Sequence, residues 1–238
     1  MKILLLGGSG WLGSNIAQNL AAKNYDLTIV TRGRKQTYLD AITNFKVIHA
    51  DKMDEAAMKE IFETPYTHVI DTVPNEKSIE LVYKYAKSLR HYIHCSSTGG
   101  YTPLPFVPCN ETAPYKGFAF GTGWDQKRIV DNLVMKLYLE NGFPATVIRP
   151  CYITGCGLLP LDNLGGRRVD FIADIIAEKT LDLPEEGKAL LQPIYLNLYE
   201  LNHLFLYLEI SLQLLNLFLS NSFENFLLLL HLLLNLQL

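Results

Sequence analysis

The sequence predicts an α/β protein built around a doubly wound parallel sheet. Short apolar segments alternate with helical segments along residues 1–155. A glycine-rich turn directly follows the first apolar segment. The composition is 49% hydrophobic and 19% charged over 238 residues, which supplies a large core and excludes a disordered chain.

The expected strands are short apolar runs, as is typical of strands that are buried on both faces. They lie at Lys2–Leu6, Asp26–Val30, Phe45–His49, His68–Ile70, Tyr92–Cys95 and Ala145–Ile148. The expected helices lie at Trp11–Lys23, Tyr38–Thr43, Asp54–Phe62, Lys77–Leu89 and Trp124–Glu140. A loop rich in Pro, Gly and Tyr spans Gly99–Gly123. Right-handed crossovers in such a sheet place ligands at the carboxyl ends of the strands.

The glycine turn has the spacing GxxGxxG, formed by Gly7, Gly10 and Gly13. We expect Gly7 to permit the tight turn, Gly10 to make room for a pyrophosphate, and Gly13 to let the helix pack on the strand. The backbone N–H groups of Trp11, Leu12 and Gly13 would then face the phosphates. The turn predicts a Rossmann-type nucleotide site, and the alternative is a glycine-rich turn without a ligand.

With this turn, the chain resembles the short-chain dehydrogenase/reductase superfamily. The resemblance is to the extended or atypical branch, which contains the NAD(P)-dependent epimerases, dehydratases and reductases of sugars and related substrates. It covers residues 1–195. It implies a dinucleotide cofactor and a nucleotide-sugar or similar carbonyl/hydroxyl compound as small-molecule substrate. It also implies, as one option, a homodimer formed through helices of the sheet domain.

The second strand runs into three cations, Arg32, Arg34 and Lys35, where an NAD-specific site would place an acid for the ribose 2′-hydroxyl. Because arginine attracts a 2′-phosphate, we expect NADP bound by Arg32, with NAD as the alternative. A solvated basic loop would have the same sequence. Asp51 matches the family's acid that meets the adenine amino group. Its alternative role is a cap for the next helix, which Asp54 can also supply.

Three further positions match the family. Val73, after the fourth strand, lies where the family lines the cofactor's ribose. Ser97 matches a serine whose hydroxyl contacts the substrate, and turn formation is an equal alternative for it. Pro150 belongs to the RPxxxxG segment Arg149–Gly155, which lies beside the nicotinamide in the family.

The family's chemistry depends on a Tyr-xxx-Lys pair, in which the phenol is the acid/base and the lysine holds the ribose and lowers the phenol's pKa. Lys127 fits the lysine, but the position four residues earlier is Gly123. Tyr83 and Lys87 have the right spacing, but they precede the fifth strand. We therefore place them on a helix away from the nicotinamide.

The missing phenol leaves three alternatives. Tyr101 or Tyr115 from the long loop could reach the site. Asp125 could serve as the acid/base. Otherwise the protein binds a nucleotide without the standard redox step. The candidate catalytic residues are therefore Ser97, Lys127 and Tyr101.

The last 43 residues, 196–238, differ from the rest of the chain: 20 are Leu, 6 are Asn, and none is Lys, Arg, Gly, Pro, Ala, Val, Thr or Asp. Leucines at positions 201, 204, 208, 212, 215 and 219 step by three and four, which predicts an amphipathic helix. Glu209, Gln213 and Asn216 disfavour a membrane span. The remaining alternative is an out-of-frame reading of AT-rich DNA.

The expected organisation is a cofactor-binding domain over 1–155, the truncated start of a substrate lobe over 156–195, and the Leu-rich tail. The net charge is −3 and the first 195 residues are neutral, so no nucleic-acid partner is expected. Four cysteines without a CxxC pair or zinc spacing predict no metal site and a reduced, cytoplasmic protein.

Three functions fit these observations. The first is an NADP(H)-dependent epimerase, dehydratase or reductase. The second is a non-redox nucleotide-binding sensor or scaffold, which Gly123 in the tyrosine position favours. The third is an inactive truncated product, which the abrupt change of composition after Tyr195 favours.

Overall fold

The computed structural model describes residues 1–34, 42, 44–101, 110–113, 115, 123–155, 158–159, 161–183, 186 and 193–195. The chain divides into two units, Met1–Tyr195 and Leu196–Leu238, and the second lies outside the described residues. The alternatives proposed for the tail therefore stay predictions. The helix expected at Tyr38–Thr43 also falls outside, apart from Ile42.

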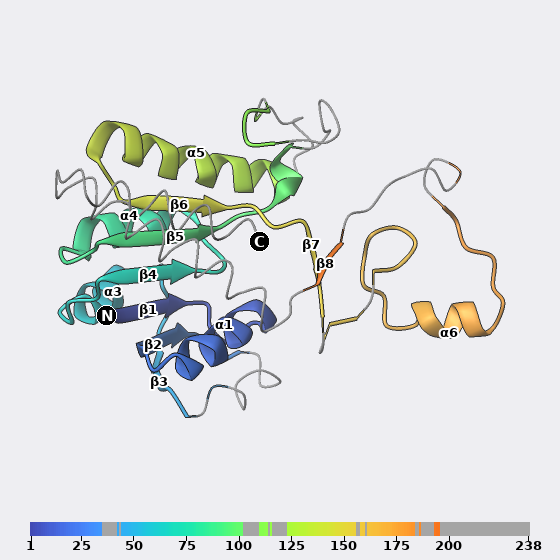
Figure 1. Cartoon of the computed structure of the whole chain (residues 1–238), viewed down its shortest axis with the longest axis horizontal. Coiled ribbons are helices and arrows are strands. Elements are labelled where there is room, and N and C mark those ends of the chain that lie inside the picture. Colours follow the sequence, from blue (N-terminus) through green and yellow to red (C-terminus); the bar gives the residue numbers. More distant parts are fainter. Residues whose placement is uncertain are drawn as a thin grey trace, which may run out of the picture. The chain divides into compact units, whose positions relative to one another are not determined.

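The predicted parallel sheet is confirmed, and Figure 1 shows its strands pointing the same way. The strands follow the order β3-β2-β1-β4-β5-β6, with every neighbouring pair parallel. They are β1 (Lys2–Leu6), β2 (Asp26–Thr31), β3 (Lys46–His49), β4 (His68–Asp71), β5 (His91–Cys95) and β6 (Ala145–Ile148). The order reverses between β1 and β4, and open α/β sheets bind ligands at the carboxyl ends of strands at such a point.

Helices connect these strands, as the alternating pattern predicts. They are α1 (Trp11–Ala22), α3 (Glu55–Ile61), α4 (Glu76–Tyr85) and α5 (Gly123–Asn141). The prediction for α4 was too long by four residues at its end. The backbone leaves the helical region at Ala86, and the N–H of Lys87 donates to the carbonyl of Tyr85. The predicted loop after β5 begins with a short 3-10 helix, η2 (Thr98–Tyr101).

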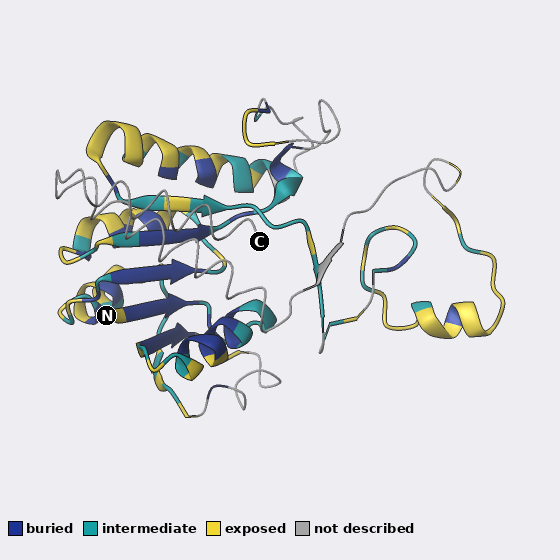
Figure 2. Ribbon diagram, viewed as in Figure 1, coloured by how far each residue is buried: buried dark blue, intermediate teal, exposed yellow. Residues whose placement is uncertain are grey.

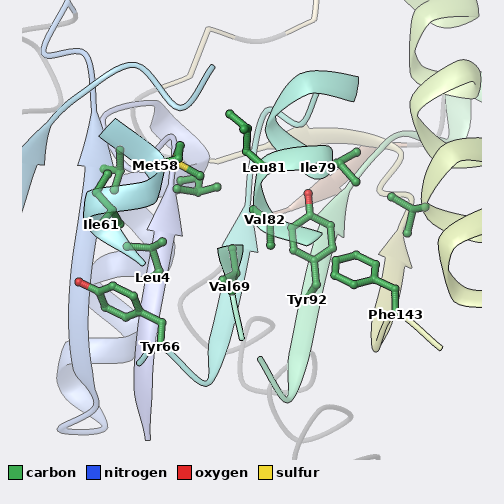
Figure 3. Packing of buried hydrophobic residues seen from close by; sticks show 14 of the residues in the cluster. Leu4, Met58, Ile61, Tyr66, Val69, Ile79, Leu81, Val82, Tyr92 and Phe143 are labelled. Atoms are coloured by element: carbon green, nitrogen blue, oxygen red, sulfur yellow. The ribbon is translucent and has the colours of Figure 1, made fainter. Parts of the chain in front are cut away.

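Two layers of apolar side chains cover the two faces of the sheet. On one face, Leu4, Val69 and Tyr92 belong to a buried cluster with Met58 of α3 and Ile79 of α4 (Figure 3). On the other face, the strand side chains that alternate with these are also buried, as is one side of α1. The central strands are consequently buried along most of their length, whereas the outer side of α5 is exposed (Figure 2). This double burial explains why the strands read as continuous apolar runs.

A second, smaller element follows β6. Here β7 (Tyr152–Thr154) pairs in parallel with β8 (Pro193–Tyr195), and α6 (Phe171–Ile176) lies between them in the chain. Between β7 and α6, the Asp162 carboxylate accepts backbone N–H groups from three residues of its own turn, Leu164, Gly166 and Arg168. These two strands were not predicted, because three residues are too few to show a periodic pattern.

Candidate cofactor-binding site

The glycine turn joins β1 to α1 at the carboxyl edge of the sheet. Gly7 has a φ of +87°, in the left-handed region that favours glycine. Its N–H donates to the carbonyl of Val30 in β2 at 3.0 Å. Thr72, after β4, donates its hydroxyl to the carbonyls of Leu6 and Gly7 at 3.1 and 3.2 Å. The turn is therefore held by both neighbours of β1.

Gly13 and Gly10 are glycines for different reasons. A Cβ atom at Gly13 would lie 2.4 Å from the carbonyl oxygen of Gly7 and 2.7 Å from the Cα of Gly8, so the packing of α1 on the turn requires glycine. A Cβ atom at Gly10 would meet no described atom nearer than 3.7 Å. The φ of Gly10 is −86°, which any residue adopts. The space beside Gly10 is therefore open to a ligand.

The first turn of α1 carries the partial positive charge of the helix dipole and has no acidic side chain of its own. Gly10 is the N-cap and offers no side chain to the helix, and the first turn contains no acidic residue. The carbonyl of Gly10 accepts the N–H of Ser14 at 2.9 Å, so the first helical bond begins there. The N–H groups of the three residues between them lie at the positive end of the helix dipole. A phosphate is the kind of group that such an end binds.

Arg32 and Asp51, which we predict to bind opposite ends of the adenosine, lie close to each other. The Nη1 atom of Arg32 is 3.8 Å from Oδ2 of Asp51, and both side chains are partly exposed. The N-cap of α3 is Asp54, whose carboxylate accepts the N–H groups of Ala56 and Ala57. Capping therefore does not account for Asp51. Its other carboxylate oxygen accepts the N–H of Met53 at 3.0 Å.

A buried ion pair next to this site was not predicted. Lys52, in the turn after β3, places its Nζ atom 2.6 Å from Oδ1 of Asp71, at the end of β4. Asp71 is fully buried, and its carboxylate also accepts the Val73 N–H and the Ser78 hydroxyl, both at 3.1 Å. Lys52 also donates to the carbonyl of Val73. The turn that carries the exposed side chain of Val73 is thus held from two sides, and that side chain lies beside Gly7.

The turn after β5 is fixed by local bonds and by β6. The hydroxyl of Ser97 accepts the N–H of Gly99 at 3.2 Å, which is the turn geometry that we considered as its alternative role. The carbonyl of Pro150 accepts the N–H of Thr98 at 3.0 Å. Ser97 and Pro150 therefore lie on adjoining segments of the carboxyl edge.

Neither loop tyrosine is arranged as an acid/base. Tyr101 is buried, and its hydroxyl accepts a hydrogen bond from Nη1 of Arg149 at 3.0 Å. Tyr115 donates its hydroxyl to Asp131 at 2.8 Å. Burial, followed by this hydrogen bond, raises the pKa of Tyr115 to about 12. A phenol with this pKa is a poor proton donor or acceptor near neutral pH.

Asp131, on α5, is the centre of a second polar network that was not predicted. Its side chain is fully buried and accepts His94 Nε2 at 2.7 Å, Tyr115 Oη at 2.8 Å and Arg149 Nε at 2.9 Å. Burial alone would raise the pKa of Asp131, but hydrogen bonds led by that from His94 hold it below its ordinary value. The carboxylate is therefore charged, and the guanidinium of Arg149 balances it.

Lys127 lies near the start of α5, one helical turn before Asp131. Burial raises the pKa of the Cys95 thiol to about 11, and the charge of Lys127 opposes this rise. The ammonium group therefore acts on the end of β5. Within the described part of the chain, Lys127 has neither a hydrogen bond nor an ion pair recorded. Asp125, the other candidate acid/base, pairs with Arg128.

Tyr83, on α4, and Lys87 lie away from this edge, as predicted, but Lys87 follows the end of the helix instead of belonging to it. Both are exposed. They line a shallow depression on the outer side of α4 together with Leu137 of α5. The ring of Tyr83 packs edge-on against Phe143, which follows the far end of α5.

The carboxyl edge gathers the predicted residues from all six strands of the sheet. Each predicted cofactor residue follows a strand end or begins the helix after it: the glycine turn, Arg32, Asp51, Val73, Lys127 and Pro150. No three described His, Cys, Asp or Glu side chains are grouped so as to hold a metal ion. The sequence did contain a signal for Asp131. This residue follows Lys127 by one helical turn, which places both residues on the same face of the helix.

Comparison with known proteins agrees with this geometry. Residues 3–80 match the NAD dependent epimerase/dehydratase family. This segment is therefore similar to the proteins of that family. It contains the glycine turn, Arg32, Asp51 and the Lys52–Asp71 pair, so the predicted resemblance is confirmed over this part of the chain.

Solved structures of epimerases share the fold of this chain. UDP-glucose 4-epimerase from Thermotoga maritima is 19% identical, with a TM-score of 0.61 over 82% of this chain and 69% of that chain. UDP-glucose-4-epimerase from Stenotrophomonas maltophila, solved with NAD and formylated UDP-arabinopyranose, is 18% identical, with a TM-score of 0.64 over 82% and 70%. The predicted doubly wound parallel fold is thereby confirmed.

A curated relative is more similar in sequence. The chloroplast stem-loop binding protein of 41 kDa b from Arabidopsis thaliana is 25% identical over 170 residues. These residues make up 65% of this chain but only 42% of the relative, so the chain spans less than half of its length. The name attributes stem-loop binding to that protein. Our expectation that this chain has no nucleic-acid partner depends on charge and stays a prediction.

Within the described residues, none of the helices has the length and apolarity needed to cross a bilayer. Dimer formation and the cytoplasmic location stay predictions.

Proposed function

We propose that this chain binds NADP(H) at the carboxyl edge of its sheet, and that it does so without the phenol-dependent redox step of its family. The observation that carries the proposal is the contrast between Gly13, which packing requires, and Gly10, which neither packing nor the backbone requires. Neither the backbone conformation nor the packing explains why residue 10 is a glycine. A pyrophosphate that approaches the backbone at the uncapped start of the helix would explain it.

The residues of the edge fit a dinucleotide. The first turn of α1 would hold the pyrophosphate, and Asp51 and Val73 would flank the adenosine. Lys127 would reach the ribose next to the nicotinamide, because that role requires only its charge and reach. Pro150 would lie beside the nicotinamide ring. When bound, the cofactor would supply a hydride donor or acceptor.

Arg32 supports NADP over NAD. Its guanidinium is about half exposed, and its only recorded partner among the described residues is Asp51, at 3.8 Å. A 2′-phosphate would offer a bidentate, doubly charged partner in place of this long contact. Solved neighbours contain NAD, so NAD is the alternative that a titration must include.

Three observations favour binding over catalysis. The family's phenol position is Gly123. The hydroxyl of Tyr101 is engaged by Arg149, and that of Tyr115 by Asp131. Asp125 is paired with Arg128. Each group that could replace the missing phenol therefore has another role within the described structure.

The first test is a fluorescence titration of the full chain with NADPH and NADH. We expect NADPH to bind, and NADH to bind about tenfold more weakly, because it lacks the 2′-phosphate. The variant Gly10→Ala should weaken NADPH binding about a hundredfold, because its methyl group occupies the approach to the helix N-terminus. Its stability should change by less than about 1 kcal/mol, since the Cβ has room.

A matched control is Gly142→Ala, beyond the end of α5. Gly142 has a φ of +65°, and a Cβ there would meet nothing within 4 Å. The strained backbone should cost about 1 kcal/mol of stability and leave NADPH binding unchanged. If Gly10→Ala binds NADPH as tightly as the wild type, the glycine turn is only a turn.

The second candidate function is an enzyme that acts on a nucleotide sugar, which the epimerase/dehydratase segment favours. It is tested by NADPH oxidation with a panel of carbonyl substrates that includes 4-keto nucleotide sugars. We expect no turnover by the wild-type chain, because the acid/base is missing. We expect Gly123→Tyr to give turnover at least about tenfold above the rate without protein, since general acid–base catalysis contributes about a hundredfold or more. Measurable turnover by the wild type, equal to that of Gly123→Tyr, would overturn the non-redox proposal.

A further inference from the structure

Four separate segments meet at the buried carboxylate of Asp131. His94 comes from β5, Tyr115 from the loop after η2, and Arg149 from the chain directly after β6. Asp131 itself lies in α5, and its side chain has no exposed surface. Because an ionised carboxylate only accepts hydrogen bonds, all three partners donate to it, with His94 doing so through Nε2. The two oxygens therefore fix the place of α5 against both strands.

The geometry around Arg149 makes this junction rigid. Its guanidinium lies 4.3 Å from the ring centre of Tyr115 and 5.3 Å from that of Tyr101. It donates to Asp131 through Nε and to the hydroxyl of Tyr101 through Nη1. A planar group held by bonds in its plane and by aromatic rings cannot rotate without losing several contacts at once.

Lys127 is one helical turn from this junction. Residues four apart lie on the same face of a helix, about 6 Å apart along its axis. Asp131 binds His94, and the charge of Lys127 acts on Cys95, the next residue of β5. The helix–strand contact that Asp131 makes therefore also fixes the distance of Lys127 from the end of β5.

We propose that Asp131 is a positioning residue that holds Lys127 at the ribose end of the cofactor site. The inference rests on the proposed NADP(H) function. Asp131 touches no cofactor atom, since it is fully buried; it acts through the start of α5. The adenosine half of the site, formed by the glycine turn and Arg32, lies on β1 and β2 and is independent of this junction.

This independence gives the test. NADPH and 2′,5′-ADP, which lacks the nicotinamide ribose, are titrated against the wild type, Asp131→Asn, Lys127→Ala and the double variant. We expect Asp131→Asn to weaken the affinity for NADPH about tenfold, which is the effect of displacing one charged contact. The affinity for 2′,5′-ADP should stay within about twofold of the wild-type value. In the Lys127→Ala background, Asp131→Asn should cause no further loss, because Asp131 acts through Lys127.

Val134→Ala is the matched control. Val134 is buried on the same face of α5, three residues after Asp131, and contributes packing without polar contacts. It should lower the melting temperature and leave the affinity for both ligands within about twofold. If Asp131→Asn does not fold, Tyr115→Phe keeps the ring on Arg149 and removes one donor, and should weaken NADPH alone by about threefold.

The outcomes separate the two claims. If the wild type binds neither ligand, the proposed function fails and this inference fails with it. If the wild type binds both and Asp131→Asn binds NADPH equally well, only the inference fails. Two other results would mean that Asp131 supports the fold as a whole and would also overturn the inference. One is an equal loss of affinity for NADPH and 2′,5′-ADP, and the other is a further loss of NADPH affinity in the double variant.

Discussion

Replacing Lys52 by methionine should lower the free energy of unfolding by about 3 kcal/mol, because it leaves the carboxylate of Asp71 buried without its counter-charge. Asp71 has no exposed side-chain surface, and only 15% of the Lys52 side chain is exposed. The carboxylate would keep the Val73 N–H and the Ser78 hydroxyl, two neutral donors that compensate part of the charge.

Urea unfolding followed by circular dichroism measures this loss. Methionine keeps most of the length and apolar surface of lysine, so the change reports on the charge rather than on packing. Lys59→Met, on the exposed side of α3, should stay within about 0.5 kcal/mol of the wild type. Adding Asp71→Asn to Lys52→Met should recover most of the loss, because it removes the stranded charge. A Lys52→Met variant as stable as the wild type would mean that the pair does not hold the two turns together.

The fold and the glycine turn could be predicted because their signals are local. The strands read as apolar runs because helices cover both faces, and the turn residues act on one another within seven positions. Gly7 adopts a positive φ and Gly13 packs against Gly7, both as predicted. Short-range geometry of this kind can be predicted from the residue spacing alone.

The two polar networks could not be predicted in the same way. Lys52 and Asp71 are 19 residues apart, and His94 and Asp131 are 37 apart. Their pairing depends on where α3 and α5 come to lie on the sheet, which no local pattern specifies. The sequence did contain partial signals. Asp71 ends a strand that is otherwise buried, so it requires partners, and Asp131 shares a helix face with Lys127.

The roles of the loop tyrosines show the same limit. Tyr101 and Tyr115 were candidates because they carry phenols near the expected site. In the structure their hydroxyls belong to the Asp131–Arg149 network, and their rings pack edge-on at 4.9 Å. A Cβ atom at Gly100 would lie 2.0 Å from the hydroxyl of Tyr115, so that glycine serves the docking of this ring. Residue type suggested chemistry, whereas the tertiary contacts indicate a structural role.

Gly13→Ala should have the second large effect, a loss of about 3 kcal/mol in unfolding free energy together with NADPH binding too weak to detect. The added methyl group would lie 2.4 Å from the Gly7 oxygen and 2.7 Å from the Gly8 Cα. Both are backbone atoms, so no side chain can rotate to relieve the overlap. Either α1 moves away from β1, or the turn loses its bonds to β2 and β4.

Gly10→Ala and Gly13→Ala therefore form a diagnostic pair for the glycine turn. Each variant adds one methyl group, at positions that are three residues apart. Both variants should abolish tight NADPH binding. Only Gly13→Ala should also lower the unfolding midpoint in urea, because only its methyl group meets the protein. If both variants were as stable as the wild type, the close packing of α1 on the turn would be wrong. If both were unstable, the open space beside Gly10 would be filled by the chain itself, and the structural argument for a bound pyrophosphate would fall.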